Sequence, residues 1–250
     1  MKRIIPILLV KDRLLYKTIN FKNPNYIGDP FIALKIFNEK EVDELVVLDI
    51  DSSKKGPDYD FLYKLSSEAF MPLSYGGGVN SVEIAEKIFR IGFEKVVLNS
   101  INFENFDILE AIASKFGNQA VVCSVDYKID FFGNRFCFFN YAKNKSKKNI
   151  FDFITQAINS GAGEILLQCI SYEGLMKKMD ISFIKKISEV SSVPVIGTGG
   201  APSQEYIKNF FDDTNASAIA AGSIFVYHGP HNAVLINYPP FEKKIKLLTR

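Results

Sequence analysis

A strand that runs into a glycine-rich turn and then into a helix occurs twice in this sequence, half a chain apart. One copy spans Pro194 to Ser203 and the other spans Pro72 to Ser81. In each copy a short apolar run ends in glycines, which permit close backbone approach, and an amphipathic helical pattern follows. Such a turn leaves backbone N–H groups uncovered at a helix start, where they and the helix dipole favour an anion. One such turn is a weak signal, but two together predict a pair of phosphate-binding turns.

Two further pairs of strands repeat in the same order. Val46 to Ile50 corresponds to Ile165 to Cys169, and Val96 to Ser100 corresponds to Ile219 to Ser223. The members of each pair lie about 120 residues apart, and self-similarity at a fixed period indicates a duplicated architecture. We therefore expect two similar halves in a chain of 250 residues.

Short apolar runs alternate with amphipathic helical patterns from one end of the chain to the other, which is typical of parallel strands covered on both faces. The expected strands are 4–10, 45–50, 72–75, 95–98, 120–125, 164–168, 193–196 and 216–220. The expected helices are 30–38, 59–67, 81–91, 106–116, 150–160, 181–190 and 203–211. An eighth helix is unclear, because residues 227–240 contain His-Gly-Pro-His and a Pro-Pro pair. The pattern predicts a single (βα)₈ barrel over residues 1–250, in half-barrels of about 1–117 and 118–250, since neither half could close alone.

Composition excludes several classes of function. The net charge of +2 gives no nucleic-acid or membrane footprint, and no apolar run reaches transmembrane length. The three cysteines, Cys123, Cys137 and Cys169, have neither metal-ligand nor redox spacing, so we expect buried thiols in a reducing cytoplasm, with no metal and no cofactor. The N-terminal apolar run ends at Lys11-Asp12 without a cleavage site, which argues against a signal peptide.

Two connections are long, 11–29 after the first strand and 126–149 after the fifth, and the second contains a Gly133-Asn134 turn that predicts a hairpin. In barrels of this kind the active site is built from the loops that follow the strands, and long loops there act as lids. The basic end of the second loop is interpreted as a solvated face, with an anion-attracting lid as the minority alternative. Its lysines are Lys143, Lys145, Lys147 and Lys148.

The strand ends supply the candidates for chemistry. Asp126 is the best candidate acid or base because it follows a strongly apolar strand, and a turn-capping role is the alternative. Asp49 is expected to order loops, and Lys17 and Lys128 either hold a phosphate or cover the rim. Two symmetric glycine turns suggest a substrate that is phosphorylated at both ends. His228 and His231 receive no catalytic role.

Charged residues also open four of the strands, at the opposite end of the expected barrel. They are Arg3, Glu44, Lys95 and Glu164. Two charges of each sign could form a closed ring that gates something passing along the barrel axis. Isolated surface charges are the alternative, and the residues alone do not exclude it.

Several segments carry a resemblance to a known family. They include Lys2-Arg3-Ile4-Ile5-Pro6, Val10-Lys11-Asp12, Gly28-Asp29-Pro30, Gly76-Gly77-Gly78-Val79, Gly161-Ala162-Gly163-Glu164 and Gly199-Gly200-Ala201. With these segments, the chain resembles the cyclase subunit of imidazole glycerol phosphate synthase over about residues 2 to 227. That family is a (βα)₈ barrel paired with a glutaminase subunit, whose ammonia enters the barrel bottom and reaches a doubly phosphorylated ribulosyl substrate at the top.

The resemblance implies a role for each matching position. The ammonia gate would be Arg3, Glu44, Lys95 and Glu164, the lid lysine Lys17 and the second catalytic aspartate Asp126. The first phosphate site would use Gly77, Gly78, Asn99 and Ser100, and the second would use Gly174, Gly199, Gly200, Gly222 and Ser223.

Two positions depart from the family. Where its first catalytic aspartate stands, this chain has Leu9, and the end of the sixth strand reads Gln168-Cys169-Ile170-Ser171-Tyr172-Glu173-Gly174. An acid or base contributes roughly 10²–10⁴ in rate, so we expect cyclisation to be damaged while phosphate and ammonia handling are retained.

The chain is most similar to a branch associated with glycosyl amidation in surface-polysaccharide synthesis. That resemblance implies a glutamine amidotransferase complex in which this subunit forms a heterodimer with a glutaminase and works with a sugar amidotransferase. A working histidine-pathway cyclase is the alternative. The related phosphoribosyl isomerase is disfavoured, because it too relies on an aspartate where this chain has Leu9.

Overall fold

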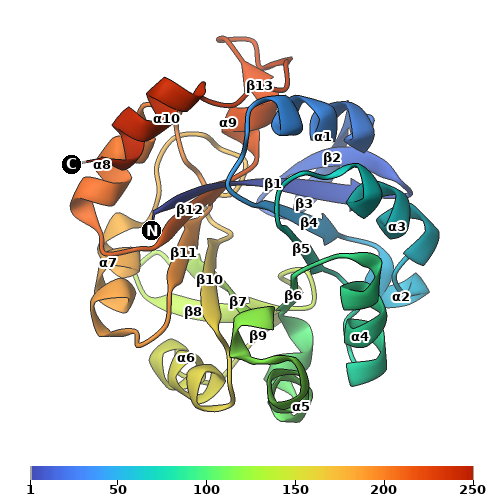
Figure 1. Cartoon of the computed structure of the whole chain (residues 1–250). Helices are drawn as coiled ribbons and strands as arrows, with labels where there is room; N and C mark the ends of the chain where they lie inside the picture. Colours follow the sequence, from blue (N-terminus) through green and yellow to red (C-terminus); the bar gives the residue numbers. More distant parts are fainter. Residues whose placement is uncertain (1, 250) are drawn as a thin grey trace.

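The computed structural model describes residues 2–249. Eight parallel strands close into a barrel, and helices surround it (Figure 1). The barrel strands, in spatial order, are β1 (Arg3–Lys11), β4 (Leu45–Asp49), β5 (Leu73–Gly76), β6 (Lys95–Leu98), β7 (Val121–Ile129), β10 (Glu164–Cys169), β11 (Val195–Thr198) and β12 (Ala218–Ala221). The sheet closes where β12 pairs with β1, Arg3 lying opposite Ala218. The predicted (βα)₈ barrel is thereby confirmed.

The outer layer consists of helices whose apolar stripes pack on the strands. They are α1 (Pro30–Glu39), α3 (Tyr59–Glu68), α4 (Val82–Ile91), α5 (Asp107–Phe116), α6 (Ile150–Asn159), α7 (Ile181–Val190) and α8 (Tyr206–Asp213). Local sequence sets several of their starts: the side chains of Asp29, Asp58, Ser81 and Asn149 each accept a hydrogen bond from the backbone at the first turn. The seven expected helices are present, although α8 begins three residues later than expected.

The segment 227–240, where an eighth helix is unclear from the sequence, forms no helix but two short paired strands, β13 (Tyr227–His228) and β14 (Ala233–Val234), and a helix lies on either side of it. The short α9 (Ser223–Val226) follows β12, and α10 (Phe241–Leu248) packs beside α8. Tyr238 is buried and donates a 3.0 Å hydrogen bond to the carbonyl of Ile4, which fixes the tail against β1. The proline-rich segment therefore contributes to the fold without continuing as a long helix.

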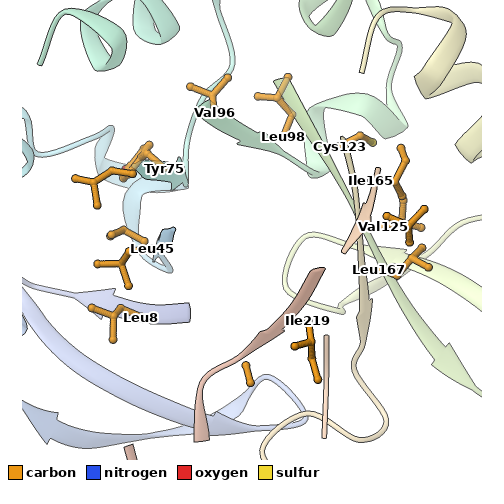
Figure 2. Close-up of a cluster of buried hydrophobic side chains, with 14 of the residues drawn as sticks. Leu8, Leu45, Tyr75, Val96, Leu98, Cys123, Val125, Ile165, Leu167 and Ile219 are labelled. Carbon is orange, nitrogen blue, oxygen red and sulfur yellow. The ribbon is translucent and has the colours of Figure 1, made fainter. Parts of the chain in front are cut away.

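The hydrophobic core has two separate parts because side chains alternate across each strand. One set points outwards and fills the layer between strands and helices. Figure 2 labels members of this set from seven of the barrel strands: Leu8, Leu45, Tyr75, Val96, Leu98, Cys123, Val125, Ile165, Leu167 and Ile219. The other set fills the barrel interior and consists of Ile5, Ile7, Val46, Val97, Val122, Leu166, Ile196, Ala218 and Ala220, with Leu9 and Leu48 packed against it.

Both long connections are hairpins. The first was expected only as a loop, and it forms β2 (Leu14–Ile19) and β3 (Lys22–Gly28), of which β2 pairs with β1. The second is the expected hairpin: β7 continues to Ile129 and pairs with β8 (Arg135–Phe139), which pairs with the short β9 (Asn144–Lys145). The first hairpin was missed because its second strand is almost wholly exposed and lacks apolar alternation.

Candidate functional site

The barrel interior changes character from one end to the other. On β1 the inward positions are Arg3, Ile5, Ile7 and Leu9, so one strand contributes a charge at the bottom and apolar groups above it. Neighbouring strands follow the same rule because parallel pairing aligns them in register. The result is a charged layer at the N-terminal mouth, an apolar middle and a polar cavity at the C-terminal mouth.

The four charges at the N-terminal mouth form a closed ring. Arg3 Nη1 lies 2.5 Å from Glu44 Oε2, and Arg3 Nη2 lies 3.0 Å from Glu164 Oε1. Lys95 Nζ lies 3.0 Å from Glu44 Oε2 and 3.2 Å from Glu164 Oε1. The four side chains are at most 18% exposed. Isolated surface charges are thus the wrong interpretation, and each cation bridges both carboxylates.

Both carboxylate oxygens of Glu44 accept hydrogen bonds, whereas only one carboxylate oxygen of Glu164 does so among the described residues. The hydroxyl of Ser74 donates a 2.7 Å hydrogen bond to Glu44 Oε1, the oxygen that is not bonded to Lys95. Glu164 Oε2 is buried and has no hydrogen-bond partner within residues 2–249. An unsatisfied buried oxygen is costly, so Glu164 Oε2 is a free acceptor position in the described ring.

A cavity of about 760 Å³ opens at the C-terminal ends of the strands. Every residue expected at the site lines it: Lys17, Gly77, Gly78, Asn99, Ser100, Asp126, Gly174, Gly199, Gly200, Gly222 and Ser223. The interior residues Ile7, Leu9, Leu48, Val97 and Leu166 form its floor. The cavity therefore lies directly above the apolar middle of the barrel.

The two glycine turns have the same geometry. Gly78 and Gly200 have φ values of +63° and +90°, and each packs on the loop after the preceding strand of the same half. A Cβ at position 78 would lie 2.6 Å from the carbonyl oxygen of Ser52, and one at position 200 would lie 2.2 Å from that of Lys178. Glycine is thus required on two counts, backbone conformation and space. Both turns border the cavity on opposite halves of the barrel.

Asp126 stands on the inward face of β7, deep in the cavity. Ser124, two residues earlier on the same face, donates a 2.9 Å hydrogen bond to Asp126 Oδ1. Desolvation raises the pKa of Asp126 to about 7, and the Ser124 hydroxyl opposes that rise. A carboxyl group with such a pKa can donate or accept a proton at neutral pH.

Leu9 occupies the inward face of β1, four strands away around the barrel from Asp126. It lines the cavity and packs on the apolar interior with Leu48. The cavity therefore lacks a carboxyl group on the described β1, opposite Asp126. Of these two facing inward positions, only the one on β7 carries a carboxyl group.

Lys17 reaches into the half of the cavity that contains Gly222. A Cβ at position 222 would lie 2.0 Å from Lys17 Nζ, so the ammonium group rests against bare backbone. Burial lowers the pKa of Lys17, while the nearby carboxylate of Glu173 opposes this change. Burial likewise raises the pKa of Glu173, and Lys17 opposes it. The pair places a desolvated cation beside the backbone of Gly222, where an anion would be stabilised.

The two hairpins close over opposite halves of the cavity. In the first, the Thr18 hydroxyl and the Phe21 amide donate to the Glu173 carboxylate at 2.9 and 3.0 Å. In the second, the amide of Asn140 donates to the Ser100 hydroxyl at 3.1 Å, and the Tyr141 hydroxyl donates to Ser53 at 2.9 Å. Both therefore have the position expected of lids.

Other candidates have structural contacts. The Asn99 side chain donates to the Ser124 carbonyl at 3.0 Å, which ties it to β7. Asp49 Oδ1 accepts from the amides of Asp51 and Ser52, so it orders the loop after β4 as expected. Lys128 lies over the ring of Phe138 and donates to the carbonyl of Ala142, so it covers the rim.

The basic end of the second loop is only in part a solvated face. Lys143 lines the cavity. Lys145 lies over the Phe136 ring, and Lys148 lies near the rings of Phe106 and Phe153.

The prediction of buried thiols is confirmed. Cys123, Cys137 and Cys169 are all buried and unpaired. Burial raises the pKa of each thiol to about 12, so none of them is a reactive thiolate at neutral pH.

Sequence reasoning missed Ser124, Thr18 and Tyr141. Ser124 had a usable signal, because it lies two residues before Asp126 and must share its face of the strand. The other two are brought to the cavity by hairpin geometry, which no local pattern indicates. Gln168 and Thr198 also line the cavity from β10 and β11.

Metal sites and membrane spans are both absent from the described part of the chain. Within residues 2–249, no three His, Cys, Asp or Glu side chains are grouped so that they could hold a metal ion. Across the same residues, none of the helices combines the length and apolarity needed to span a bilayer.

Fold and cavity together define a (βα)₈ barrel protein with a similar glycine turn in each half and a polar cavity at the carboxyl ends of the strands. The chain belongs to the histidine biosynthesis protein family, whose model matches residues 3–232.

Individual relatives are similar over nearly their whole length. A Pseudomonas aeruginosa protein with the provisional name imidazole glycerol phosphate synthase subunit hisF2 is 44% identical over 244 residues, 97% of each chain. A Vibrio vulnificus protein provisionally named as subunit hisF3 is 44% identical over 97% of this chain and 95% of its own. The imidazole glycerol phosphate synthase subunit HisF of Streptococcus sanguinis is 37% identical over 90% of each chain.

Proposed function

We propose that this chain is the ammonia-conducting subunit of a glutamine amidotransferase complex. It receives ammonia from a glutaminase subunit at the N-terminal mouth and releases it at the C-terminal cavity, which binds a phosphorylated ligand, for use by a separate amide-forming synthetase. The product is an amidated sugar, of the kind built into surface polysaccharides. The single observation that carries this proposal is the closed ring of Arg3, Glu44, Lys95 and Glu164 below an apolar interior.

The ring lies at the N-terminal mouth, so it cannot contribute to a reaction that takes place only at the C-terminal face of the barrel. Taking four charges out of water is costly unless all are paired, and here a buried oxygen, Glu164 Oε2, is left without a partner among the described residues. An entrance for a small neutral donor accounts for both features, because ammonia donates hydrogen bonds and crosses an apolar interior more easily than an ion does.

The cavity supports an anionic ligand. Gly78 and Gly200 mark two turns where backbone alone can approach a ligand, and Lys17 adds a desolvated cation beside Gly222 in the same half of the barrel as Gly200. The turns face the cavity from opposite halves of the barrel. A ligand with a phosphate at each end would engage both.

Leu9 separates this proposal from cyclisation. Ring closure on the ribulosyl substrate uses two carboxyl groups in the family that the chain resembles, and here Leu9 leaves Asp126 to act alone. A group with a pKa of about 7 can still exchange a proton with a ligand in the cavity at neutral pH.

The names of the relatives are compatible with this proposal. Those at 44% identity are numbered hisF2 and hisF3, as further copies beside a histidine-pathway subunit would be. A HisF subunit of imidazole glycerol phosphate synthase is the second candidate function, favoured by the retained Asp126 and by the relative at 37% identity.

The deciding experiment compares two reactions of one preparation. The purified chain is assayed for cyclisation with ammonia and the ribulosyl substrate, and then, with its glutaminase and an amide-forming synthetase that acts on a sugar, for transfer of ¹⁵N from glutamine amide to the sugar product. We expect label in the sugar and little or no cyclisation. Normal cyclase turnover without label in the sugar would establish the second candidate instead.

A further inference from the structure

Two adjacent phenylalanines stand free at the tip of the β7–β8 hairpin. Phe131 is 98% exposed and Phe132 is 86% exposed, and their rings meet edge to face at 5.7 Å. Single exposed apolar residues are common on protein surfaces, but a contiguous aromatic pair at a protruding tip marks an interaction site.

The tip is rigid because Asp130 organises it. Asp130 Oδ1 accepts hydrogen bonds from the amides of Phe132 and Asn134 at 2.9 and 2.8 Å, and the Asp130 amide donates to the Asn134 carbonyl at 2.9 Å. Gly133 completes the turn with a φ of +83°. The two rings are therefore held on a preformed turn, which lowers the entropy lost when a partner binds.

A basic groove begins beside this tip. It runs between the hairpin and the N-terminal ends of α6 and α7, and no Asp or Glu is among its lining residues. Its cations are Arg135, Lys145, Lys147, Lys148 and Lys186. Arg135 is neutralised by Asp180 at 2.7 Å, whereas within residues 2–249 the four lysines form no ion pair.

Aromatic rings lie under the charges of the groove. Lys145 Nζ is 3.2 Å from the centre of the Phe136 ring, and Lys186 Nζ is 4.6 Å from that of Phe151. The groove thus combines an apolar floor with a cationic rim. Interfaces between proteins have aromatic centres and polar margins of this kind.

The position of this surface gives it a role. The tip and groove lie on the same face as the cavity, because they follow the C-terminal end of β7 and the helices begin there. The inner side of the same hairpin contributes Phe139, Asn140 and Tyr141 to the cavity wall. A protein bound outside would therefore contact the element that closes the cavity, at the end opposite the charged ring.

We propose that Phe131, Phe132 and the four groove lysines dock the enzyme that consumes the ammonia, through an acidic face with an apolar pocket for the two rings. This inference rests on the proposed function, since it assigns that enzyme to the C-terminal face and the glutaminase to the other. A second copy of this chain docked through the same surface would bring lysines against lysines, so charge complementarity disfavours it as the occupant.

The test uses this chain in complex with its glutaminase, together with the purified amide-forming synthetase. Binding is measured by biolayer interferometry for wild type, F131S/F132S and K145E/K148E, with Y63S and K185E as controls. Tyr63 is an exposed aromatic residue on α3, away from the groove, and Lys185 is the exposed neighbour of Lys186 outside the groove. Thermal unfolding verifies that each variant is folded.

We expect the aromatic variant to bind about tenfold or more weakly and the charge-reversed variant to lose most of the salt dependence of binding. The control variants should bind like wild type. A photo-reactive phenylalanine analogue at position 131 should crosslink to the synthetase, which tests the surface without removing it.

Other results would overturn either the docking inference or the proposed function. Equal binding by F131S/F132S and wild type would overturn the docking inference. Nitrogen transfer at the wild-type rate by both variants would leave the proposed function standing but would exclude this surface as the docking site. Failure of the wild-type protein to bind the synthetase would also overturn the docking inference. If wild type then sediments with phosphatidylglycerol vesicles, the occupant is an anionic membrane. Binding that depends on the tip, but without nitrogen transfer, would retain the surface and refute the proposed function.

Discussion

The Thr18 hydroxyl donates a 2.9 Å hydrogen bond to the carboxylate of Glu173, although 155 residues separate them. Thr18 belongs to the β2–β3 hairpin and Glu173 to the loop after β10, so this bond fastens one lid across the barrel mouth. The same carboxylate accepts from the Phe21 amide and faces Lys17. One side chain therefore couples closure of the lid to the position of the buried lysine.

Replacing Glu173 by Gln should loosen that lid. The charge-assisted bonds from Thr18 and Phe21 are lost or weakened, and each is worth about 1.5–3 kcal/mol. Hydrogen exchange of the Phe21 amide should accelerate about tenfold or more, because the hairpin opens locally. Glu189→Gln, on the exposed side of α7, is the control; equal exchange in both variants would show that Glu173 does not hold the lid.

Asp126 should make the protein less stable as the pH rises. Its pKa is about 7 in the folded chain and 3.8 in an unperturbed carboxyl group, so between these values the folded state binds more protons than the unfolded state. The stabilisation that protonated Asp126 contributes to the folded state is therefore complete below about pH 3.8 and is lost as the pH rises to about 7. Asp126→Asn removes the loss.

Urea unfolding at pH 5 and pH 8 measures this effect. The free energy of unfolding of Asp126→Asn minus that of wild type should be about 1–3 kcal/mol larger at pH 8 than at pH 5. Access of cavity water to the carboxyl group reduces this value. The exposed Asp213→Asn serves as the comparison. If the pH dependence of Asp126→Asn matched that of wild type, the carboxyl group would titrate normally.

Leu9→Asp should restore part of a two-carboxylate site. The new side chain would enter the cavity from β1, facing Asp126 across the barrel. We expect cyclisation with ammonia to rise about tenfold or more over wild type, since an acid or base contributes roughly 10²–10⁴. Leu9→Asn is the matched control, and an equal rise in both variants would exclude acid–base chemistry as the cause.

Gly200→Ala should damage the second glycine turn. The added Cβ would lie 2.2 Å from the Lys178 carbonyl oxygen, whereas at Gly229, with a φ of +72°, it would meet nothing within 4 Å. Both substitutions carry the strain of a positive φ, so their difference isolates the lost space. We expect inorganic phosphate to bind at least about tenfold more weakly to Gly200→Ala by calorimetry, and unchanged binding would remove this turn from the anion site.

Lys95→Ala should destabilise the barrel strongly. It leaves Glu44 and Glu164 with only Arg3, and an uncompensated buried charge costs about 3–5 kcal/mol. Lys64→Ala breaks an exposed pair with Asp60 at 3.1 Å and should cost no more than about 1 kcal/mol. Urea unfolding compares the two; a loss for Lys95→Ala as small as for Lys64→Ala would show that the ring is solvated.

Local patterns in the sequence determined the barrel itself. Short β-branched runs can be buried on both faces only in a parallel sheet, and the fixed distance between the two Gly-rich turns required two like halves. The period of two along a strand also places Arg3 and Leu9 on the same face of one strand. These properties follow from neighbouring residues, so the residues alone express them.

Tertiary structure decided everything that depends on distant partners. Whether Arg3, Glu44, Lys95 and Glu164 were a ring or four separate surface charges depended on closure of the sheet between β12 and β1, which aligns their strands. The pKa of Asp126 is set by the depth of the cavity around it, and the contact of Thr18 with Glu173 by how a hairpin folds back. Burial of a side chain and a contact across 155 residues depend on segments that are distant in the sequence, so no local pattern can predict them.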